Sequence, residues 1–358
     1  MGHRYIGSKS KILDVVIDKI GTLVPERSHI TDLMTGTATV AIELRKKNYQ
    51  VTANDLMTYS YHHAVTGLKL DSIPLFEGAS DFISSKISAK DFGNNLSNYE
   101  KIILALNNSE PLKGYFWNEL SPSGTPKNTE NPRSYYSSEN AAKIDGIRLN
   151  IAKMYSQNQL TDNEYSLLLH DVIMGTNDIA NIAGTYGHHM SKLVGRAKTP
   201  LNLYTSKLLL KDDSERHEVK QGYAEEISKE ISCDLCYIDP PYMKRQYAAN
   251  YHVLETLARG DEPEAIGVSG LRPWRDQYSN FCTKTKIRDS FREIFTNMDC
   301  NNFLISYSED GLLNLEDFKE LLTPFGDVYI DEFVHKRFKS NGSSLNNNLT
   351  EYLIHLSK

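Results

Sequence analysis

The 358-residue sequence lacks the features that would place it in a membrane or in an oxidising compartment. It has no run of 18 apolar residues, so it predicts no transmembrane helix. The opening stretch, MGHRYIGSKSKIL, lacks the apolar core of a signal peptide, and we therefore expect a cytoplasmic protein. Four cysteines in a chain of this length argue against a disulfide framework.

Two of these cysteines, Cys233 and Cys236, form a C-x-x-C pattern that also occurs in redox and zinc sites. No second cysteine pair follows, and the surrounding residues are apolar and typical of a strand. In a strand, a spacing of three places two side chains on opposite faces. We therefore expect buried core cysteines here, and the sequence predicts no metal site.

The charge of the chain is unevenly distributed. A net charge of −6 does not by itself indicate a nucleic-acid-binding protein. Residues 185–211, however, contain five Lys or Arg residues and no Asp or Glu, and the stretch HKRFKSNGSS from His335 is also basic without acids. Short charge runs are usually only solvated surface, so these runs are weak support for a basic binding face.

The spacing of apolar residues predicts an α/β protein with an insertion. Residues 29–55 indicate a strand, a turn, a helix and a second strand, as in a parallel crossover unit. Strands and helices alternate again after residue 215, with helices expected at 286–298 and 314–322. Between them, at 71–214, strand signals are scarce and amphipathic helices dominate. We expect one α/β domain formed by residues 1–70 and 215–358, interrupted by a helical insertion at 71–214.

The segment DLMTGTATVA, Asp32 to Ala41, is a first candidate binding site. A strand ends, Gly36 allows a tight turn, and small residues let the backbone approach a ligand at the start of a helix. Asp55 lies 19 residues after Gly36, just after the second strand, where an acid accepts hydrogen bonds from a ribose diol. Because a single glycine is present, an ordinary turn with a surface Asp is the alternative.

A second candidate is the sequence Asp239-Pro240-Pro241-Tyr242, at the end of the apolar stretch CDLCYI. Prolines cannot donate to a strand ladder, so the strand must stop here. Pro240 offers a carbonyl but no N–H, and this carbonyl and the Asp239 carboxylate are two acceptors suited to an amine with two hydrogens. The bland alternative is an edge strand that ends in a surface tyrosine.

These two acceptors suit the exocyclic amine of adenine, which is a poor nucleophile because its lone pair is delocalised into the ring. Hydrogen bonds from both N–H groups to Asp239 and to the Pro240 carbonyl would localise that lone pair for in-line attack. Such catalysis relies on positioning and electrostatics. Tyr242 would stack on a base that has left the duplex.

These motifs together resemble those of the Dam-like (D12 class) N6-adenine DNA methyltransferases, and in particular a subset that accompanies restriction enzymes. The resemblance rests on YIGSK at the N-terminus, DLMTGTATVA and DPPY in that order, and on further segments such as RQYAANYHVLETLA, SGLR and TEYL. It extends over most of the chain. It implies a Rossmann-like methyltransferase sheet with an antiparallel seventh strand, a catalytic domain formed by residues 1–70 and 215–358, and an inserted target-recognition region at 71–214.

The resemblance also assigns roles to individual residues. It implies S-adenosylmethionine as the methyl donor and double-stranded DNA as the partner, with catalysis by Asp239, Pro240 and Tyr242. The cofactor-binding residues it implies are Tyr5, Gly7, Lys9, Asp32, Met34, Gly36, Asp55, Tyr223 and Asp239. Two departures affect the cofactor site: the loop MTGTAT has fewer small or aromatic residues than usual, and Gly222-Tyr223 stands where an Asp-Phe pair is common.

The insertion would then read DNA sequence. Its segment NIAGTYGHHMSKLVGRAK offers groups for phosphate and base contacts, and we expect Lys192 and Arg196 to bind DNA. Lys244 and Arg245 follow the catalytic corner, where the phosphates of a flipped nucleotide would pass.

The resulting hypothesis is a site-specific adenine-N6 DNA methyltransferase, either of a restriction-modification system, with a cognate restriction endonuclease as a further partner, or an orphan relative of such enzymes. N4-cytosine methylation, RNA adenine methylation and a catalytically silent DNA-recognition subunit are the alternatives. Cytosine enzymes more often carry Ser at the position of Asp239, which favours adenine.

Overall fold

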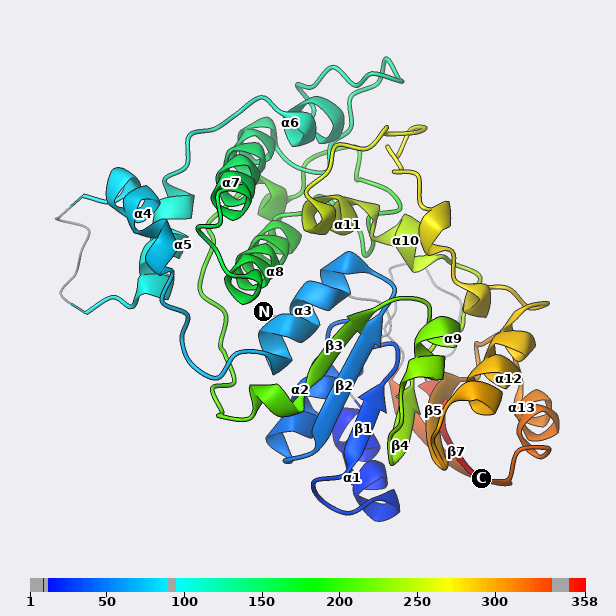
Figure 1. Cartoon of the computed structure of the whole chain (residues 1–358). Coiled ribbons are helices and arrows are strands. Elements are labelled where there is room, and N and C mark those ends of the chain that lie inside the picture. Colours follow the sequence, from blue (N-terminus) through cyan, green and yellow to red (C-terminus); the bar gives the residue numbers. More distant parts are fainter. Residues whose placement is uncertain (1–8, 10–11, 89–94, 337–347) are drawn as a thin grey trace. The chain divides into compact units, whose positions relative to one another are not determined.

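A computed structural model describes residues 9, 12–88, 95–336 and 348–358 of the chain (Figure 1). Tyr5 and Gly7, two of the expected cofactor-binding residues, lie outside these residues. The chain divides into two compact units. We call the unit containing Gly7–Leu68, Glu215–Tyr247 and Gln277–Lys358 the sheet unit, and the unit containing Lys69–Ser214 and Ala248–Asp276 the helical unit.

The sheet unit is built on a seven-stranded sheet with the order β3-β2-β1-β4-β5-β7-β6. Strands β1 to β5 pair in parallel, whereas β7 runs antiparallel to both β5 and β6. This order, with its reversed strand, confirms the expected Rossmann-like methyltransferase sheet. The strands are β1 (His29–Asp32), β2 (Gln50–Asp55), β3 (Glu218–Gln221), β4 (Leu235–Ile238), β5 (Asn302–Ser308), β6 (Asp327–Lys336) and β7 (Asn348–Ser357).

Helices pack on both faces of this sheet because the central strands are apolar on both sides. Along β4, Leu235 and Tyr237 join one core with α1 and α2, while Cys236 and Ile238 join the other with α12 and α13. The expected core role of Cys236 is therefore confirmed. The helices of this unit are α1 (Leu13–Leu23), α2 (Thr39–Lys46), α3 (Thr58–Leu68), α9 (Ala224–Ile227), α12 (Ile287–Asn297) and α13 (Leu315–Leu322), and its short 3-10 helices include η5 (Ser228–Glu230) and η7 (Asn280–Cys282).

The described residues of the helical unit form helices joined by long loops, with no strand among them. Thr161 and Glu164 form a capping box at the start of α8. The helices are α4 (Ser80–Lys86), α5 (Asn98–Asn107), α6 (Tyr115–Leu120), α7 (Ser138–Ser156), α8 (Asp162–Asp178) and α11 (His252–Arg259), with the 3-10 helices η2 (Glu77–Ala79) and η3 (Gly195–Lys198). Three short helices fall at the divisions between the units: α10 (Tyr247–Asn250), η4 (Ser214–Arg216) and η6 (Arg275–Gln277).

Residues 248–276 pack with the helical unit, although the sequence analysis grouped them with the α/β domain. α11 lies against α8 (Figure 1). The turn that follows α11 is held by the fully buried guanidinium of Arg133, which donates to the carbonyl of Gly267 at 2.9 Å and to that of Val268 at 3.2 Å. Arg133 also forms an ion pair with the buried Glu119 at 2.6 Å.

Candidate active site

Three carboxylates lie at the carboxyl ends of parallel strands, along one edge of the sheet. Asp32 is the last residue of β1, Asp55 is the last of β2, and Asp239 directly follows β4. Because these strands are parallel, their carboxyl ends share one edge. β1 is the strand at which the order reverses, since β2 lies on one side of it and β4 on the other. Ligands of doubly wound sheets bind at this switch point.

Asp32 is almost completely buried at this edge, with 1% of its surface exposed. Thr35 Oγ1 donates a hydrogen bond of 3.0 Å to its Oδ2. Its Oδ1 has no hydrogen-bond partner within the described chain. Burial raises the pKa of Asp32 to about 7, although the bond from Thr35 acts to lower it. A buried carboxylate with an open oxygen suits a cationic ligand.

The loop after β1 makes a tight turn and fixes Asp55. Gly36 and Ala38 adopt left-handed backbone angles, with φ of 54° and 59°. The Gly36 N–H donates to Asp55 Oδ2 and the Met57 N–H donates to Oδ1, both at 2.8 Å. The Asp55 carboxylate is therefore held against the loop, and Met34 lies half-buried at the start of that loop.

Asn54 supports the loops around Asp55 and was not predicted from the sequence. Its buried side-chain amide donates to the carbonyl of Leu33 at 3.0 Å and to that of Gly222 at 3.2 Å. The Gly222 N–H in turn donates to the Asp55 carbonyl at 3.1 Å. These bonds bring the segment that carries Tyr223 to the end of β2. Its position just before Asp55 in the strand was the only available signal.

The corner after β4 presents Tyr242 next to Asp239. The Tyr242 ring packs edge to face on Tyr307, with ring centroids 5.7 Å apart, and its carbonyl accepts a 3.0 Å hydrogen bond from the Leu312 N–H. Gly311 allows the close approach of this loop, because a Cβ there would lie 2.1 Å from the Tyr307 ring. The tyrosine is thus anchored from below and remains partly exposed.

Lys9 connects the corner to a fourth carboxylate. Its Nζ lies 3.0 Å from Asp239 Oδ1 and 3.5 Å from Glu351 Oε2, and 5.6 Å from the centroid of the Tyr242 ring. Burial acts to lower the pKa of Lys9, but the two carboxylates outweigh it and hold that pKa above its ordinary value. Burial raises the pKa of Asp239 to about 6, with Lys9 acting against the rise and Glu351 adding to it.

Glu351 was not predicted as a site residue. It pairs with Ser308, the last residue of β5, so the beginning of the antiparallel β7 lies at the edge where the parallel strands end. Glu351 is buried, with 5% of its surface exposed. The sequence segment TEYL carried Glu351, but only the direction of β7 shows that this residue faces the catalytic corner.

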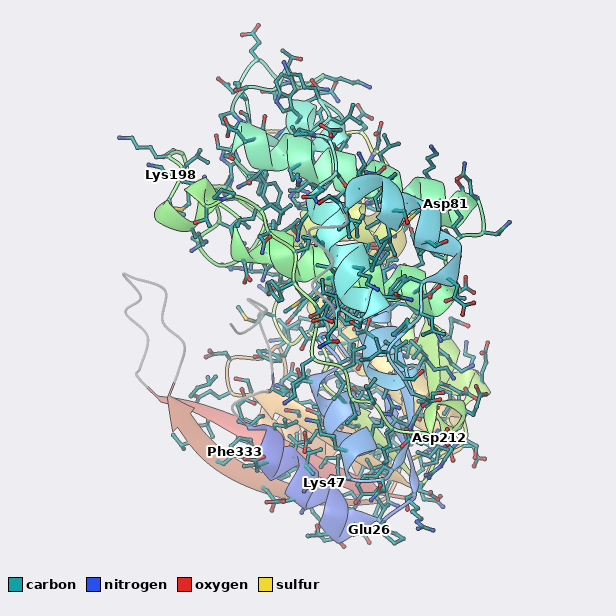
Figure 2. The ribbon with its side chains drawn as sticks, turned by 90° about the vertical axis from the view of Figure 1, so that its left-hand side faces the viewer. Glu26, Lys47, Asp81, Lys198, Asp212 and Phe333 are labelled. Atoms are coloured by element: carbon teal, nitrogen blue, oxygen red, sulfur yellow. The ribbon has the colours of Figure 1, made fainter. Side chains whose placement is uncertain are left out.

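The expected DNA-binding residues differ in their surroundings. Lys244 and Arg245 are exposed just after the corner, where the neighbouring Gln246 is fixed by two hydrogen bonds with the backbone of Ser279. In the helical unit, Lys192 is exposed, whereas Arg196 donates to the Ala180 carbonyl at 2.8 Å. Arg196 therefore supports its own loop. Figure 2 shows Lys198 of η3 extending away from the ribbon.

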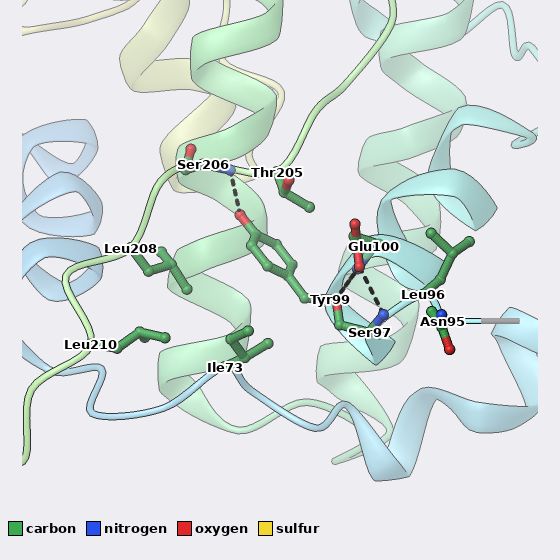
Figure 3. Close-up of a pocket in the computed structure, with 10 residues that line it drawn as sticks. All are labelled: Ile73, Asn95, Leu96, Ser97, Tyr99, Glu100, Thr205, Ser206, Leu208 and Leu210. Atoms are coloured by element: carbon green, nitrogen blue, oxygen red, sulfur yellow. Dashed lines mark hydrogen bonds between the residues drawn. The ribbon is translucent and has the colours of Figure 1, made fainter. Parts of the chain in front are cut away.

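A hollow of about 530 Å³ in the helical unit contains none of the expected site residues (Figure 3). Tyr99 lies at its wall, and its hydroxyl donates to the buried Asp171 at 2.6 Å and accepts from the Ser206 N–H at 2.8 Å. These bonds satisfy the polar groups at its base. Its lining is mixed, with the apolar Ile73, Leu96, Leu208 and Leu210 beside the polar Asn95, Ser97, Glu100 and Thr205.

The described residues provide no other obvious site. No group of three or more His, Cys, Asp or Glu side chains in this part of the chain is arranged to hold a metal ion. None of its helices combines the length and apolar character needed to cross a bilayer.

Comparison with known proteins decides the family. The model of the D12 class N6 adenine-specific DNA methyltransferases matches residues 5–321. The chain belongs to this family. The match includes the loop after β1, the helical unit and the corner after β4, so the resemblance drawn from the sequence motifs is confirmed.

The relatives of this family member are modification enzymes. Type II methyltransferase M.FokI of Planomicrobium okeanokoites is 32% identical over 99% of this chain, and the chain spans about half of that protein, 52% of its length. Type II methyltransferase M.CviAII of Paramecium bursaria Chlorella virus 1 is 31% identical over 98% of this chain and 96% of its own. Type II methyltransferase M.NlaIII of Neisseria lactamica is 29% identical over 99% of both.

A solved structure, precorrin 8W decarboxylase from Methanobacterium thermoautotrophicum, covers 96% of this chain and 90% of its own with 10% identity and a TM-score of 0.32. A similarity at that level bears on neither the fold nor the function.

Proposed function

We propose that this D12 family member methylates the N6 amine of adenine in duplex DNA, with S-adenosylmethionine as the methyl donor. The observation that carries the proposal is the position of Asp239 and Pro240. Both directly follow the buried strand β4, beside the switch point where Asp32 ends β1. The Asp239 carboxylate and the Pro240 carbonyl are two hydrogen-bond acceptors, and Pro240 has no N–H that could donate at the same place. An amine with two hydrogens needs two such acceptors.

The residues at the sheet edge fit a donor with cationic groups and a ribose. Asp32 has a buried carboxylate oxygen without a hydrogen-bond partner in the described chain, which suits a positive charge. Asp55, held by Gly36 and Met57 at the end of β2, would accept hydrogen bonds from a ribose diol. Met34, Gly36 and Tyr223 would line the same site, and Lys9 would lie where it meets the catalytic corner. When bound, S-adenosylmethionine supplies an electrophilic methyl group on a sulfonium.

The chain's own residues position the amine. Asp239 and the Pro240 carbonyl accept hydrogen bonds from its two N–H groups. These bonds draw the nitrogen lone pair out of conjugation with the base. Tyr242, anchored on Tyr307, offers its ring for stacking on the flipped base. The ionised form of Asp239 is the acceptor, so activity falls as the pH decreases through the pKa of this carboxyl, which is about 6 in the ligand-free protein.

DNA binding is proposed for exposed cations in both units. Lys244 and Arg245 follow the catalytic corner, and Lys192 is exposed in the loop of the helical unit. The Arg196 guanidinium binds the carbonyls of Ala180 and Ile182 in its own loop, so its proposed contact with DNA comes in addition to this structural role. We further propose that the helical unit reads the target sequence, and that the protein acts in the cytoplasm beside a cognate restriction endonuclease.

Transfer of labelled methyl groups to unmethylated genomic DNA tests this function. The wild-type protein should label N6 of adenine, and Asp239→Ala should abolish the labelling. Asp327→Ala removes an exposed carboxylate from β6 of the same sheet and should leave it unchanged. Label on cytosine or on RNA alone would favour the other methyltransferase activities. DNA binding without transfer would refute the enzymatic function.

A further inference from the structure

Glu351 and Asp239 share one lysine across two strands that are far apart in the sequence. Asp239 follows β4 and Glu351 lies near the start of β7, with β5 between these strands in the sheet. Lys9 Nζ lies between the two carboxylates, at 3.0 Å from Asp239 and 3.5 Å from Glu351. The side chains of Lys9 and Glu351 are 6% and 7% exposed, so water screens this contact only weakly.

Among the described residues, most of the charges that act on Asp239 and Tyr242 are negative. Asp32 lies near Asp239 from β1, and Asp310 acts on Tyr242 from the loop after β5. Together with Glu351 they surround the catalytic corner with carboxylates, against which Lys9 supplies a positive charge. A burial of two carboxylates is tolerated when a cation binds both of them.

We propose that Glu351 is a positioning residue for methyl transfer, which acts by sharing Lys9 with Asp239. The inference rests on the proposed function. An ammonium group has three donors, so Lys9 can bind both carboxylates at once. With Glu351 present, part of the attraction on Lys9 is directed away from Asp239. The Asp239 carboxylate then keeps acceptor capacity for the target amine.

Removal of the Glu351 charge has two consequences. Lys9 is drawn onto Asp239, where its N–H groups compete with the amine of the base for the same oxygens. The pKa of Asp239 decreases as well, because Glu351 is one of the groups that raise it. Removal of Lys9 has the opposite effect on this pKa, since Lys9 is the group that lowers it most. The two substitutions therefore shift the acid side of the pH profile in opposite directions.

The test measures methyl transfer to unmethylated genomic DNA by the full chain at saturating S-adenosylmethionine, from pH 5 to pH 9. Glu351→Gln keeps the size of the side chain, and we expect kcat to fall by about 10- to 100-fold, as for a catalytic group displaced by about 1 Å. The acid limb of kcat/KM should move to lower pH. Lys9→Met should move that limb to higher pH.

Two further variants and a control identify the route of the effect. In a Lys9→Met background, Glu351→Gln should cause little additional loss of kcat, because Glu351 acts through the lysine. Glu351→Asp retains the charge and should recover part of the rate. Glu332→Gln removes a carboxylate from the neighbouring strand β6 and should change neither kcat nor the limb.

The outcomes separate this inference from the proposed function. A wild-type protein that transfers no methyl group refutes the function itself and this inference with it. An active wild type with Glu351→Gln equal to it in kcat and in pH profile overturns the role of Glu351 alone. A folded Glu351→Gln whose loss of kcat is undiminished in the Lys9→Met background overturns it too.

Discussion

Replacing Asp32 by Asn should stabilise the ligand-free protein while weakening its proposed binding of S-adenosylmethionine. Folding raises the pKa of this carboxyl from 3.8 to about 7, mainly through burial. The folded state therefore holds a proton that the unfolded chain has released, and stability falls as the pH increases from 4 to 7. Asn has nearly the same shape, can accept the hydrogen bond from Thr35, and carries no charge.

The size of the effect follows from this pKa difference. The raised pKa of Asp32 lowers the free energy of unfolding by about 4 kcal/mol at pH 8. At pH 5 it lowers this free energy by only about 2 kcal/mol, because the folded protein then keeps the Asp32 carboxyl mostly protonated. Burial of the amide that Asp32→Asn introduces has a cost that does not depend on pH. The difference in the free energy of unfolding between variant and wild type therefore tests the reasoning best through its change from pH 5 to pH 8. We expect the advantage of Asp32→Asn in the free energy of unfolding to increase by about 2 to 3 kcal/mol from pH 5 to pH 8.

Urea denaturation followed by far-UV circular dichroism, with hydrogen exchange of the β1 amides, is the suitable assay. Tryptophan fluorescence is not, because both tryptophans, Trp117 and Trp274, lie in the helical unit. Asp55→Asn is a control with the opposite sign, since Asp55 accepts two backbone N–H groups and an amide can satisfy only one of them. Equal stabilisation by Asp32→Asn at both pH values would refute the reasoning, as would undiminished binding of S-adenosylmethionine in equilibrium dialysis.

Substitutions at Arg133 and at Lys244 or Arg245 probe the helical unit and the proposed DNA contact. Arg133→Met leaves the carboxylate of Glu119 buried without its partner and should lower the free energy of unfolding by about 3 to 5 kcal/mol, as measured by tryptophan fluorescence in urea. Adding Glu119→Leu should recover most of this loss, and a cost below about 1 kcal/mol for the single change would contradict the role of the pair. Lys244→Ala or Arg245→Ala should reduce the slope of log affinity for duplex DNA against log salt by about 1 each, as measured by fluorescence anisotropy. Lys229→Ala, which removes an exposed cation paired with Glu226, serves as the control, and an unchanged slope in the first two variants would exclude a phosphate contact.

The sequence predicted those parts of the fold that have a clear period. The helices expected at 286–298 and 314–322 are found at Ile287–Asn297 and Leu315–Leu322. β4 was recognisable because it is apolar on both faces and ends at two prolines. β3 was missed, since Glu218–Gln221 is short, polar and partly exposed at the edge of the sheet. α3 was missed too, because nearly all of its residues are buried and it shows no polar face.

The sequence predicted those site residues that end a strand or directly follow one. Asp32, Asp55 and Asp239 each end or follow a strand, and parallel pairing then brings them to one edge. Glu351 could not be found in this way, because its position depends on the antiparallel direction of β7. The binding of Arg196 to the Ala180 carbonyl was equally inaccessible, since it depends on a loop whose path no periodic pattern describes.

The hydrogen bonds of Arg133 also determine what can be exchanged between relatives. A chimera that replaces only Lys69–Ser214 separates Arg133 from the turn at 265–270, whose carbonyls it binds. It also separates the guanidinium from Gly270, where a Cβ would lie 2.6 Å from Arg133 Nε. The helical unit is therefore discontinuous, and a graft of this proposed target-recognition module has to carry Ala248–Asp276 along with Lys69–Ser214.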